Sequence, residues 1–225
     1  MRFHYIGSLL TFMNSFKGHY KFNNVERKDV KIAIIDDESF PLKETLQQHK
    51  FNIDVFLDVT SIEQFAGYEI ILCDIQGVGK QFSQKYQGAY IVNEIYKRFP
   101  FKVLMSYTSK STDITFNKYL HYAEFSIKKD ADSEEWVEKL DTAIKLVSDP
   151  ENRWIRTRNY LLEKGVSLFE LALLEDEYVR HIIENKPFDD FPPKKLRGKI
   201  TDEIETILKD FTNIIKLINT VVIDE

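Results

Sequence analysis

The chain has 225 residues and a formal net charge of -5, because 31 Lys and Arg face 36 Asp and Glu. Hydrophobic residues make up 43% of it, which is enough to bury a core and excludes wholesale disorder. The acidic balance argues against non-specific nucleic-acid binding, which needs clustered Lys and Arg to neutralise phosphates. Cys73 is the one cysteine, so an intramolecular disulfide is excluded. No apolar run approaches the roughly 20 residues of a membrane-spanning helix, and we therefore expect a cytoplasmic protein.

Three parts are expected along the chain: an N-terminal extension over 1–30, an α/β domain over 31–150 and a helical region over 151–225. The first part mixes aromatic residues with Gly, Lys and Asn and carries no motif. The middle part alternates short apolar runs with helical patterns, and the last part contains no convincing strand.

Short runs rich in β-branched residues predict the strands of the middle part, since strands buried on both faces read as continuous apolar runs. The expected strands are 30–35, 53–57, 69–74, 101–106 and 124–127. Helical patterns follow them at 40–50, 61–65, 88–99, 112–122 and 133–147. Five such strand-then-helix units predict an α/β fold with a five-stranded parallel sheet and helices on both faces.

Two long helices, at about 153–185 and 200–222, are expected to form an α-helical hairpin, with the proline-containing stretch 187–193 between them. Apolar residues recur in the second helix at alternating steps of four and three: Ile200, Ile204, Ile207, Phe211, Ile214, Ile218 and Val221. This heptad seam is typical of a coiled coil. It either pairs with a second copy as a homodimer or forms the inner face of a packed hairpin.

Polar residues end the expected strands at the edge where their carboxyl ends meet, and α/β sheets bind ligands at that edge. Asp36 and Asp37 end the first strand, Asp74 the third and Ser106 the fourth, and Lys128 follows the fifth. Carboxylates this close repel each other and invite Mg²⁺, which prefers oxygen ligands. Such a site suits phosphoryl transfer to a carboxylate, which gives an acyl phosphate.

The arrangement resembles the receiver domain of two-component response regulators over about 31–147. In that family an acidic pair ends the first strand, a phosphoacceptor aspartate the third, and a Ser or Thr the fourth. A lysine follows the fifth strand, with an aromatic residue three positions before it. The matching residues here are Ile34-Ile35-Asp36-Asp37-Glu38, Ile71-Leu72-Cys73-Asp74-Ile75, Val103-Leu104-Met105-Ser106, and Phe125 with Lys128. The resemblance implies a flavodoxin-like, doubly wound fold.

The resemblance also implies a phosphoacceptor and a metal site. Asp74 would take phosphate from a histidine of a cognate histidine kinase or phosphotransfer protein. Asp36, Asp37, Asp74 and the backbone carbonyl of Gln76 would hold Mg²⁺. Such a phosphoprotein signals to an output partner, here an unknown protein, and is not an enzyme that acts on an external substrate.

Three further residues would carry the switch that the resemblance implies. Lys128 would pair with the phosphoryl group, Ser106 would hydrogen-bond it and Phe125 would rotate inward, which reshapes a remote surface. The sequence departs from the family around them, since Lys129 replaces the usual proline after the lysine. Tyr107 stands where a small residue is usual, where it would narrow phosphate access, and Thr108 is the alternative hydroxyl if the strand ends later.

Other readings remain open for the sequence. One is a degenerate receiver that switches without phosphate. Another is a transcription regulator with a helical DNA-binding output, whose basic side chains would be Arg153, Arg156, Arg158, Lys194, Lys195, Arg197 and Lys199. A third is a phosphotransfer protein that uses His181 on the first long helix.

Overall fold

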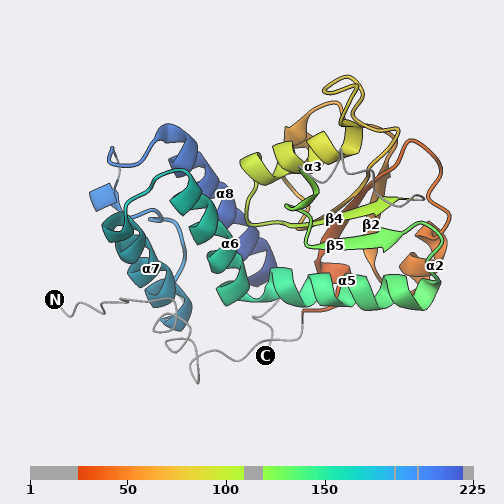
Figure 1. Cartoon of the computed structure of the whole chain (residues 1–225). Helices are drawn as coiled ribbons and strands as arrows, with labels where there is room; N and C mark the ends of the chain where they lie inside the picture. The colour runs from red at the N-terminus through yellow and green to blue at the C-terminus, as the bar shows by residue number, and fades with distance from the viewer. Residues whose placement is uncertain (1–24, 109–118, 185, 197, 220–225) are drawn as a thin grey trace. The chain divides into compact units, whose positions relative to one another are not determined.

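The computed structural model describes residues 25–108, 119–184, 186–196 and 198–219 (Figure 1). They fall into two compact units, one spanning Val25–Ser148 and the other containing the described residues from Asp149 onward. Most of the helix expected at 112–122 lies outside the described residues, as does the extension before Val25.

A five-stranded, all-parallel sheet forms the centre of the first unit, as predicted. Its order is β2-β1-β3-β4-β5, and the strands are β1 (Lys31–Ile35), β2 (Asn52–Phe56), β3 (Ile70–Asp74), β4 (Val103–Thr108) and β5 (Phe125–Lys128). The three central strands are buried almost throughout. Helices therefore have to cover both faces, and this is why the strands read as unbroken apolar runs.

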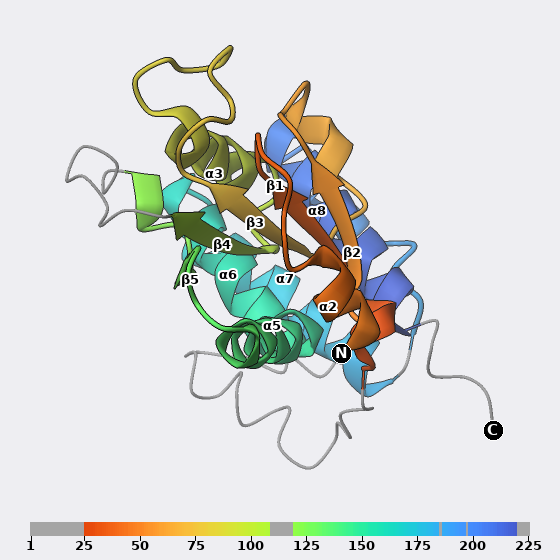
Figure 2. The same ribbon diagram turned by 90° about the vertical axis from the view of Figure 1, so that its right-hand side faces the viewer.

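Helices cover the two faces of the sheet as expected (Figure 2). On one face, α2 (Lys43–Gln48) and α5 (Ser133–Ser148) pack over an apolar core that contains Leu46, Trp136 and Leu140. On the other face lie α3 (Gln87–Arg98) and the 3-10 helix η2 (Ile62–Phe65). A second short 3-10 helix, η1 (Arg27–Asp29), precedes β1.

Two buried charged residues lie where β3 and β4 begin, at the edge of the sheet away from the strand ends that carry the site. The Glu69 carboxylate accepts a hydrogen bond of 2.6 Å from the Lys31 backbone N–H. The Lys102 ammonium donates to three backbone carbonyl oxygens at the end of η2, those of Phe65 at 2.7 Å, Ala66 at 2.8 Å and Tyr68. Each buried charge is thus compensated by hydrogen bonds from or to the backbone.

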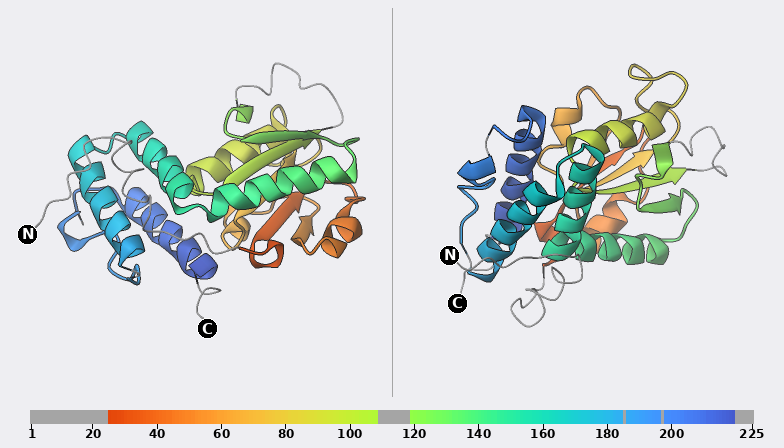
Figure 3. Two further views of the ribbon diagram at one scale, coloured as in Figure 1. Left: turned by 90° about the horizontal axis from the view of Figure 1, so that it is seen from below. Right: turned by 60° about the vertical axis from the view of Figure 1, so that its left-hand side comes forward.

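Three α-helices, not a two-helix hairpin, make up the described part of the second unit (Figure 3). They are α6 (Pro150–Glu163), α7 (Leu168–Ile183) and α8 (Asp202–Asn219), with the 3-10 helix η3 (Lys194–Leu196) before α8. The expected helix over 153–185 is therefore wrong. Gly165 adopts a left-handed φ of 80° after α6, and Ser167 begins α7 with a capping box to Glu170. These stop and start signals override the continuous apolar pattern.

The first four positions of the heptad seam are buried within the chain itself, since Ile200, Ile204, Ile207 and Phe211 are all at most 7% exposed. The Phe211 ring centroid lies 5.3 Å from that of Tyr178. These positions therefore form an inner face, and the side chains of the seam from 214 onward lie outside the described residues. None of the helices in the described ranges has both the length and the apolar character that crossing a membrane requires.

Candidate functional site

Three carboxylates meet at the carboxyl end of the sheet. Asp74 is the last residue of β3, and Asp36 follows β1, whose residue Ile35 is in register with Cys73. One side-chain oxygen each of Asp36, Asp37 and Asp74 lies within 4.8 Å of the others. Asp36 and Asp74 are buried and Asp37 is exposed. The chain thus gathers the three acidic residues that the sequence singled out.

The ammonium group at these carboxylates belongs to Lys129 and not, as expected, to Lys128. The Lys129 Nζ lies 2.6 Å from Asp74 Oδ2 and 3.3 Å from Asp36 Oδ1. Lys128 is exposed and is the last residue of β5, in register with Thr108. Successive side chains of a strand point to opposite faces of the sheet. Lys128 therefore points away from the face on which Ile127 is buried, and Lys129 points towards that face.

The residue of β4 beside the phosphoacceptor candidate is Tyr107 and not Ser106. Tyr107 is in register with Asp74, whereas the buried Ser106 is in register with Cys73 and so faces the other side of the sheet. The strand runs on to Thr108, which is longer than expected, so Ser106 is not its last residue. The Tyr107 hydroxyl donates a hydrogen bond of 3.3 Å to the Ile35 carbonyl oxygen.

Phe125 begins β5, whereas the Gln76 backbone adjoins the carboxylates at the end of β3. Phe125 is half-buried in β5, in register with Met105, and packs against the core on the α5 side of the sheet. The Gln76 backbone N–H donates to Asp74 Oδ1 at 3.1 Å, so the backbone expected to supply a carbonyl ligand does adjoin the carboxylates.

Burial and charge act against each other at the site. Burial raises the pKa of Asp74, although hydrogen bonds from Lys129 and from the Gln76 N–H work in the opposite direction. Burial alone would lower the pKa of Lys129, but its ion pairs with Asp74 and Asp36 outweigh it and raise the pKa above its usual value. Burial and the neighbouring Asp36 raise the pKa of the Tyr107 hydroxyl. Lys129 is therefore held in its charged form, and Tyr107 in its neutral form.

The donor set fits a hard divalent cation. All three clustered side chains offer carboxylate oxygens, and Lys129 leaves negative charge in excess. The loop after β3 approaches closely, because a Cβ at Gly77 would lie 2.1 Å from Asp37 Oδ1. The φ of 96° at Gly77 favours glycine there, since side chains rarely adopt this left-handed backbone. Oxygen ligands with this charge are those that Mg²⁺ prefers, so Asp36, Asp37 and Asp74 suit it as ligands.

The long loop after β3 is fixed to neighbouring segments. The Gly79 N–H donates to Asp58 Oδ1 at 2.6 Å, and the Gln81 side-chain amide donates to the Val59 carbonyl oxygen. Lys80, within this loop, lies 4.0 Å from Asp37 Oδ2. The loop therefore brings a second ammonium group to the exposed side of the carboxylates.

Mg²⁺ is expected to raise the melting temperature of the protein, since a ligand that binds the folded state alone stabilises it by about 2.7 kcal/mol at a hundredfold excess over Kd. Asp36→Ala removes a buried ligand and should abolish the shift in a thermal melt with Mg²⁺ against EDTA. Glu38→Gln is the matched control, because the exposed Glu38 contributes only its backbone N–H, which donates to Asp36 Oδ1 at 3.0 Å. An equal shift in Asp36→Ala would place the ion elsewhere.

Gly88→Ala is expected to destabilise the first unit by about 1–3 kcal/mol, the usual cost of overpacking. Gly88 lies in the first turn of α3, and a Cβ there would be 1.7 Å from the Asp74 carbonyl oxygen. The helix must then shift away from the strand end that carries Asp74. Gly67→Ala is the control, since its Cβ would meet nothing within 4 Å. Urea unfolding of both variants tests the difference, and equal midpoints would contradict it.

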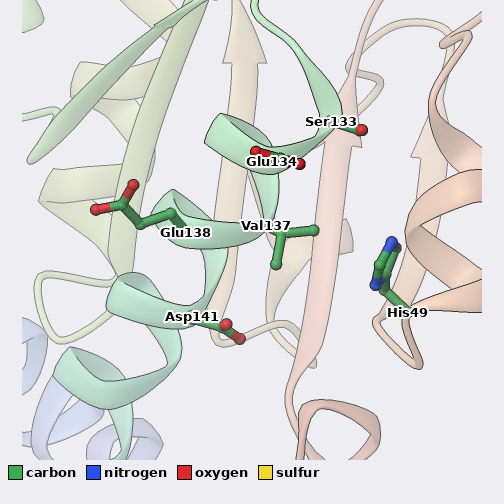
Figure 4. Close-up of a pocket in the computed structure, with 6 residues that line it drawn as sticks. All are labelled: His49, Ser133, Glu134, Val137, Glu138 and Asp141. Carbon is green, nitrogen blue, oxygen red and sulfur yellow. The ribbon is translucent and has the colours of Figure 1, made fainter.

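A separate pocket of about 310 Å³ lies between the end of α2 and α5 (Figure 4). Its lining contains none of the residues discussed above and consists of His49, Ser133, Glu134, Val137, Glu138 and Asp141. Asp141 is already paired with Arg27 at 2.7 Å. The four titratable residues of this pocket also do not converge closely enough to form a metal-binding group within the described residues.

His181 and two of the arginines behind the alternative readings are placed unfavourably for those functions. His181 is 7% exposed, its ring stacks on Phe188 at 4.8 Å, and its Nε2 lies 3.5 Å from Glu177 Oε1. A phosphotransfer histidine has to be reached by its partner, which this burial prevents. Arg153 is fully buried, and Arg158 Nε lies 2.5 Å from Glu175 Oε1, so these two arginines are not part of a basic surface.

Neither a scan against protein-family models nor a search of curated proteins finds a match. Solved structures of receiver domains do match about half of the chain. A CheY-like response regulator receiver domain protein from Methanospirillum hungatei JF-1 is 18% identical with a TM-score of 0.41, and the match covers 52% of this chain and 97% of that chain. The response regulator TrrA from Thermotoga maritima, solved with Mg²⁺ and BeF, is 24% identical with a TM-score of 0.40. This match covers 51% of this chain and 98% of that chain. The NtrX receiver domain from Brucella abortus is 17% identical with a TM-score of 0.43, and the match covers 51% of this chain and 98% of that chain.

The topology itself carries the assignment of the fold. The order β2-β1-β3-β4-β5 with parallel pairing throughout is the flavodoxin-like order, in which ligands bind beyond the carboxyl ends of the strands. The acidic cluster occupies that edge. The described residues of Val25–Ser148 therefore have the flavodoxin-like fold of response-regulator receiver domains, and the matches leave the rest of the chain unassigned.

Proposed function

We propose that the first unit is the receiver of a two-component response regulator and that Asp74 is its phosphoacceptor. The observation that supports this most is the cluster of Asp36, Asp37 and Asp74 oxygens within 4.8 Å, with the Lys129 ammonium 2.6 Å from Asp74. An oxygen-rich cluster and a cation around one buried carboxylate suit the charge that develops as a phosphoryl group arrives.

An oxygen of the Asp74 carboxylate attacks the phosphorus of a phosphohistidine on a cognate histidine kinase or phosphotransfer protein. The bond between phosphorus and the donor nitrogen breaks, and its electron pair leaves with the imidazole. Asp36, Asp37, Asp74 and the backbone carbonyl of Gln76 would hold Mg²⁺, which would offset the charge of the phosphoryl oxygens. Lys129 exchanges its ion pair with the Asp74 carboxylate for one with the phosphoryl oxygens.

The helical second unit transmits the signal through contact with a partner protein. Leu168 and Phe169, adjacent in the first turn of α7, are each 69% exposed in the described part of the chain and offer apolar side chains to such a partner. The buried Arg153 and the paired Arg158 do not support a DNA-binding output. The chemistry at Asp74 modifies the protein itself, so no external substrate is turned over.

Acetyl phosphate with Mg²⁺, followed by intact-mass measurement, tests the phosphoacceptor. We expect one added phosphate that is absent in Asp74→Asn and is released by hydroxylamine, as an acyl phosphate should be. Asp54→Asn is the matched control, since Asp54 lies on β2 and accepts a hydrogen bond from the Tyr68 hydroxyl at 2.8 Å. A wild-type protein that takes up no phosphate with Mg²⁺, or an Asp74→Asn variant that still does, would overturn the proposal.

A further inference from the structure

Tyr107 lies beside the candidate phosphoacceptor, on the neighbouring strand β4. It is in register with Asp74 and 1% exposed, and its hydroxyl donates to the carbonyl oxygen of Ile35, the residue before Asp36. The same side chain thus adjoins both strands that carry the buried carboxylates. The buried Ser106 faces the other side of the sheet and is not placed for this contact.

The Lys129 ammonium also rests on the Tyr107 ring. Its Nζ lies 5.2 Å from the ring centroid while it pairs with Asp74 at 2.6 Å. A cation this close to an aromatic face is attracted by it, and more strongly where both are partly desolvated. A change of charge on Asp74 that moves Lys129 must therefore change the contact between the ammonium and the ring.

On its other side the Tyr107 ring belongs to a three-ring cluster. Its centroid is 5.6 Å from that of Trp136, in the first turn of α5, and 6.1 Å from that of Phe40, between β1 and α2. Phe40 and Trp136 meet at 5.3 Å, and all three pairs are edge-to-face. Rings packed this way move together, since a buried core does not leave room for one to shift alone.

The Trp136 indole N–H is buried and has no hydrogen-bond partner among the described residues. An unsatisfied buried donor costs free energy, so an arrangement that gives it an acceptor competes with the present one. A displacement of the rings that brings an acceptor to this N–H is therefore favoured at Trp136.

We propose that Tyr107 is a positioning residue that couples the charge state of Asp74 to Trp136 on α5. The inference rests on the proposed function, because it assumes that Asp74 gains a phosphoryl group. Lys129 leaves the Tyr107 ring as it follows the phosphoryl oxygens, the ring shifts in the space released, and Trp136 shifts with it. The signal then reaches the first turn of α5 through the α2 and α5 side of the sheet.

Fluorine NMR of the full chain labelled with 5-fluorotryptophan tests this coupling. The chain has two tryptophans, and a Trp154→Phe variant assigns the two signals. Mg²⁺ with beryllofluoride, and separately Mg²⁺ with acetyl phosphate, should shift the Trp136 signal. Tyr107→Met should lose the shift, Tyr107→Phe should restore it because the ring remains, and Ser106→Ala should keep it.

Intact mass measured on the same samples separates the two claims. Phosphate uptake at Asp74 with an unmoved Trp136 signal in the wild-type protein would overturn the coupling and leave the proposed function intact. An undiminished shift in Tyr107→Met would overturn the role of Tyr107. Absence of uptake in the wild-type protein would overturn the proposed function itself and the coupling with it. The wild-type arm needs no variant, so the coupling can be contradicted even if Tyr107→Met fails to fold.

Discussion

Lys129→Ala is expected to slow phosphate uptake from acetyl phosphate by about 100-fold or more, which is the usual cost of removing one preorganised group that stabilises developing charge. Lys129 Nζ lies 2.6 Å from Asp74 Oδ2, and its side chain is only 25% exposed. Bulk water cannot replace the ammonium well in so confined a place. The increase of intact mass with time, at a fixed Mg²⁺ concentration, gives the rate of phosphate uptake.

Lys128→Ala is the matched control, because it removes the same charge one residue earlier in the chain. Lys128 is exposed at the end of β5, so its loss should leave the rate close to that of the wild-type protein. A result in which Lys128→Ala is the slow variant would mean that the lysine predicted from sequence spacing is the functional one after all. Equal rates in both variants would mean that neither ammonium acts on the phosphoryl group.

Lys102→Met is expected to lower the free energy of unfolding by about 3 kcal/mol, although Lys102 lies at the opposite edge of the sheet from the cluster of Asp36, Asp37 and Asp74. The buried ammonium donates to the carbonyl oxygens of Phe65, Ala66 and Tyr68, and a methionine leaves these acceptors unsatisfied. Burial already raises the pKa of Glu69, and Lys102 is one of the charges that oppose this shift. Its removal therefore also makes the Glu69 carboxylate more costly to bury.

Lys97→Met provides the comparison for this stability effect. The Lys97 side chain is 53% exposed and pairs with Glu94 at 2.8 Å, and exposed pairs of this kind contribute at most about 1 kcal/mol. Urea unfolding followed by circular dichroism should separate the two variants clearly. If both lost the same small amount, the three carbonyl contacts of Lys102 would contribute little to stability.

The strands and the acidic cluster were predictable because each depends on local patterns. Buried parallel strands read as apolar runs, and Asp36 and Asp74 come directly after or at the end of such runs. Parallel pairing then brings the carboxyl ends of the strands to one edge of the sheet, independently of the loops that connect them. The boundary of β4 was less predictable, since all six of its residues are buried and no alternation marks its end.

Lys128 and Ser106, instead of their neighbours Lys129 and Tyr107, were predicted to lie at the carboxylates for one common reason. A shift of one residue along a strand reverses the face to which every side chain points, and sequence spacing does not fix that parity. The ends of β4 and β5 are set by their pairing, in which Thr108 meets Lys128. The break at Gly165 was predictable from the sequence. A glycine there is typical of a helix end, and a serine three residues before Glu170 is typical of the start of the next helix.

The two ammonium groups at the carboxylates differ in how they will respond to ionic strength. Lys80 is 50% exposed at 4.0 Å from Asp37, whereas Lys129 and Asp74 expose 25% and 5% of their side chains. Dissolved ions screen exposed charges beyond roughly 8 Å at physiological salt but act much less on buried pairs. Added salt should therefore weaken the pull of Lys80 on an approaching anionic donor while leaving the inner ion pair intact. Encounter with the donor would become slower in salt, and the chemical step that follows would not.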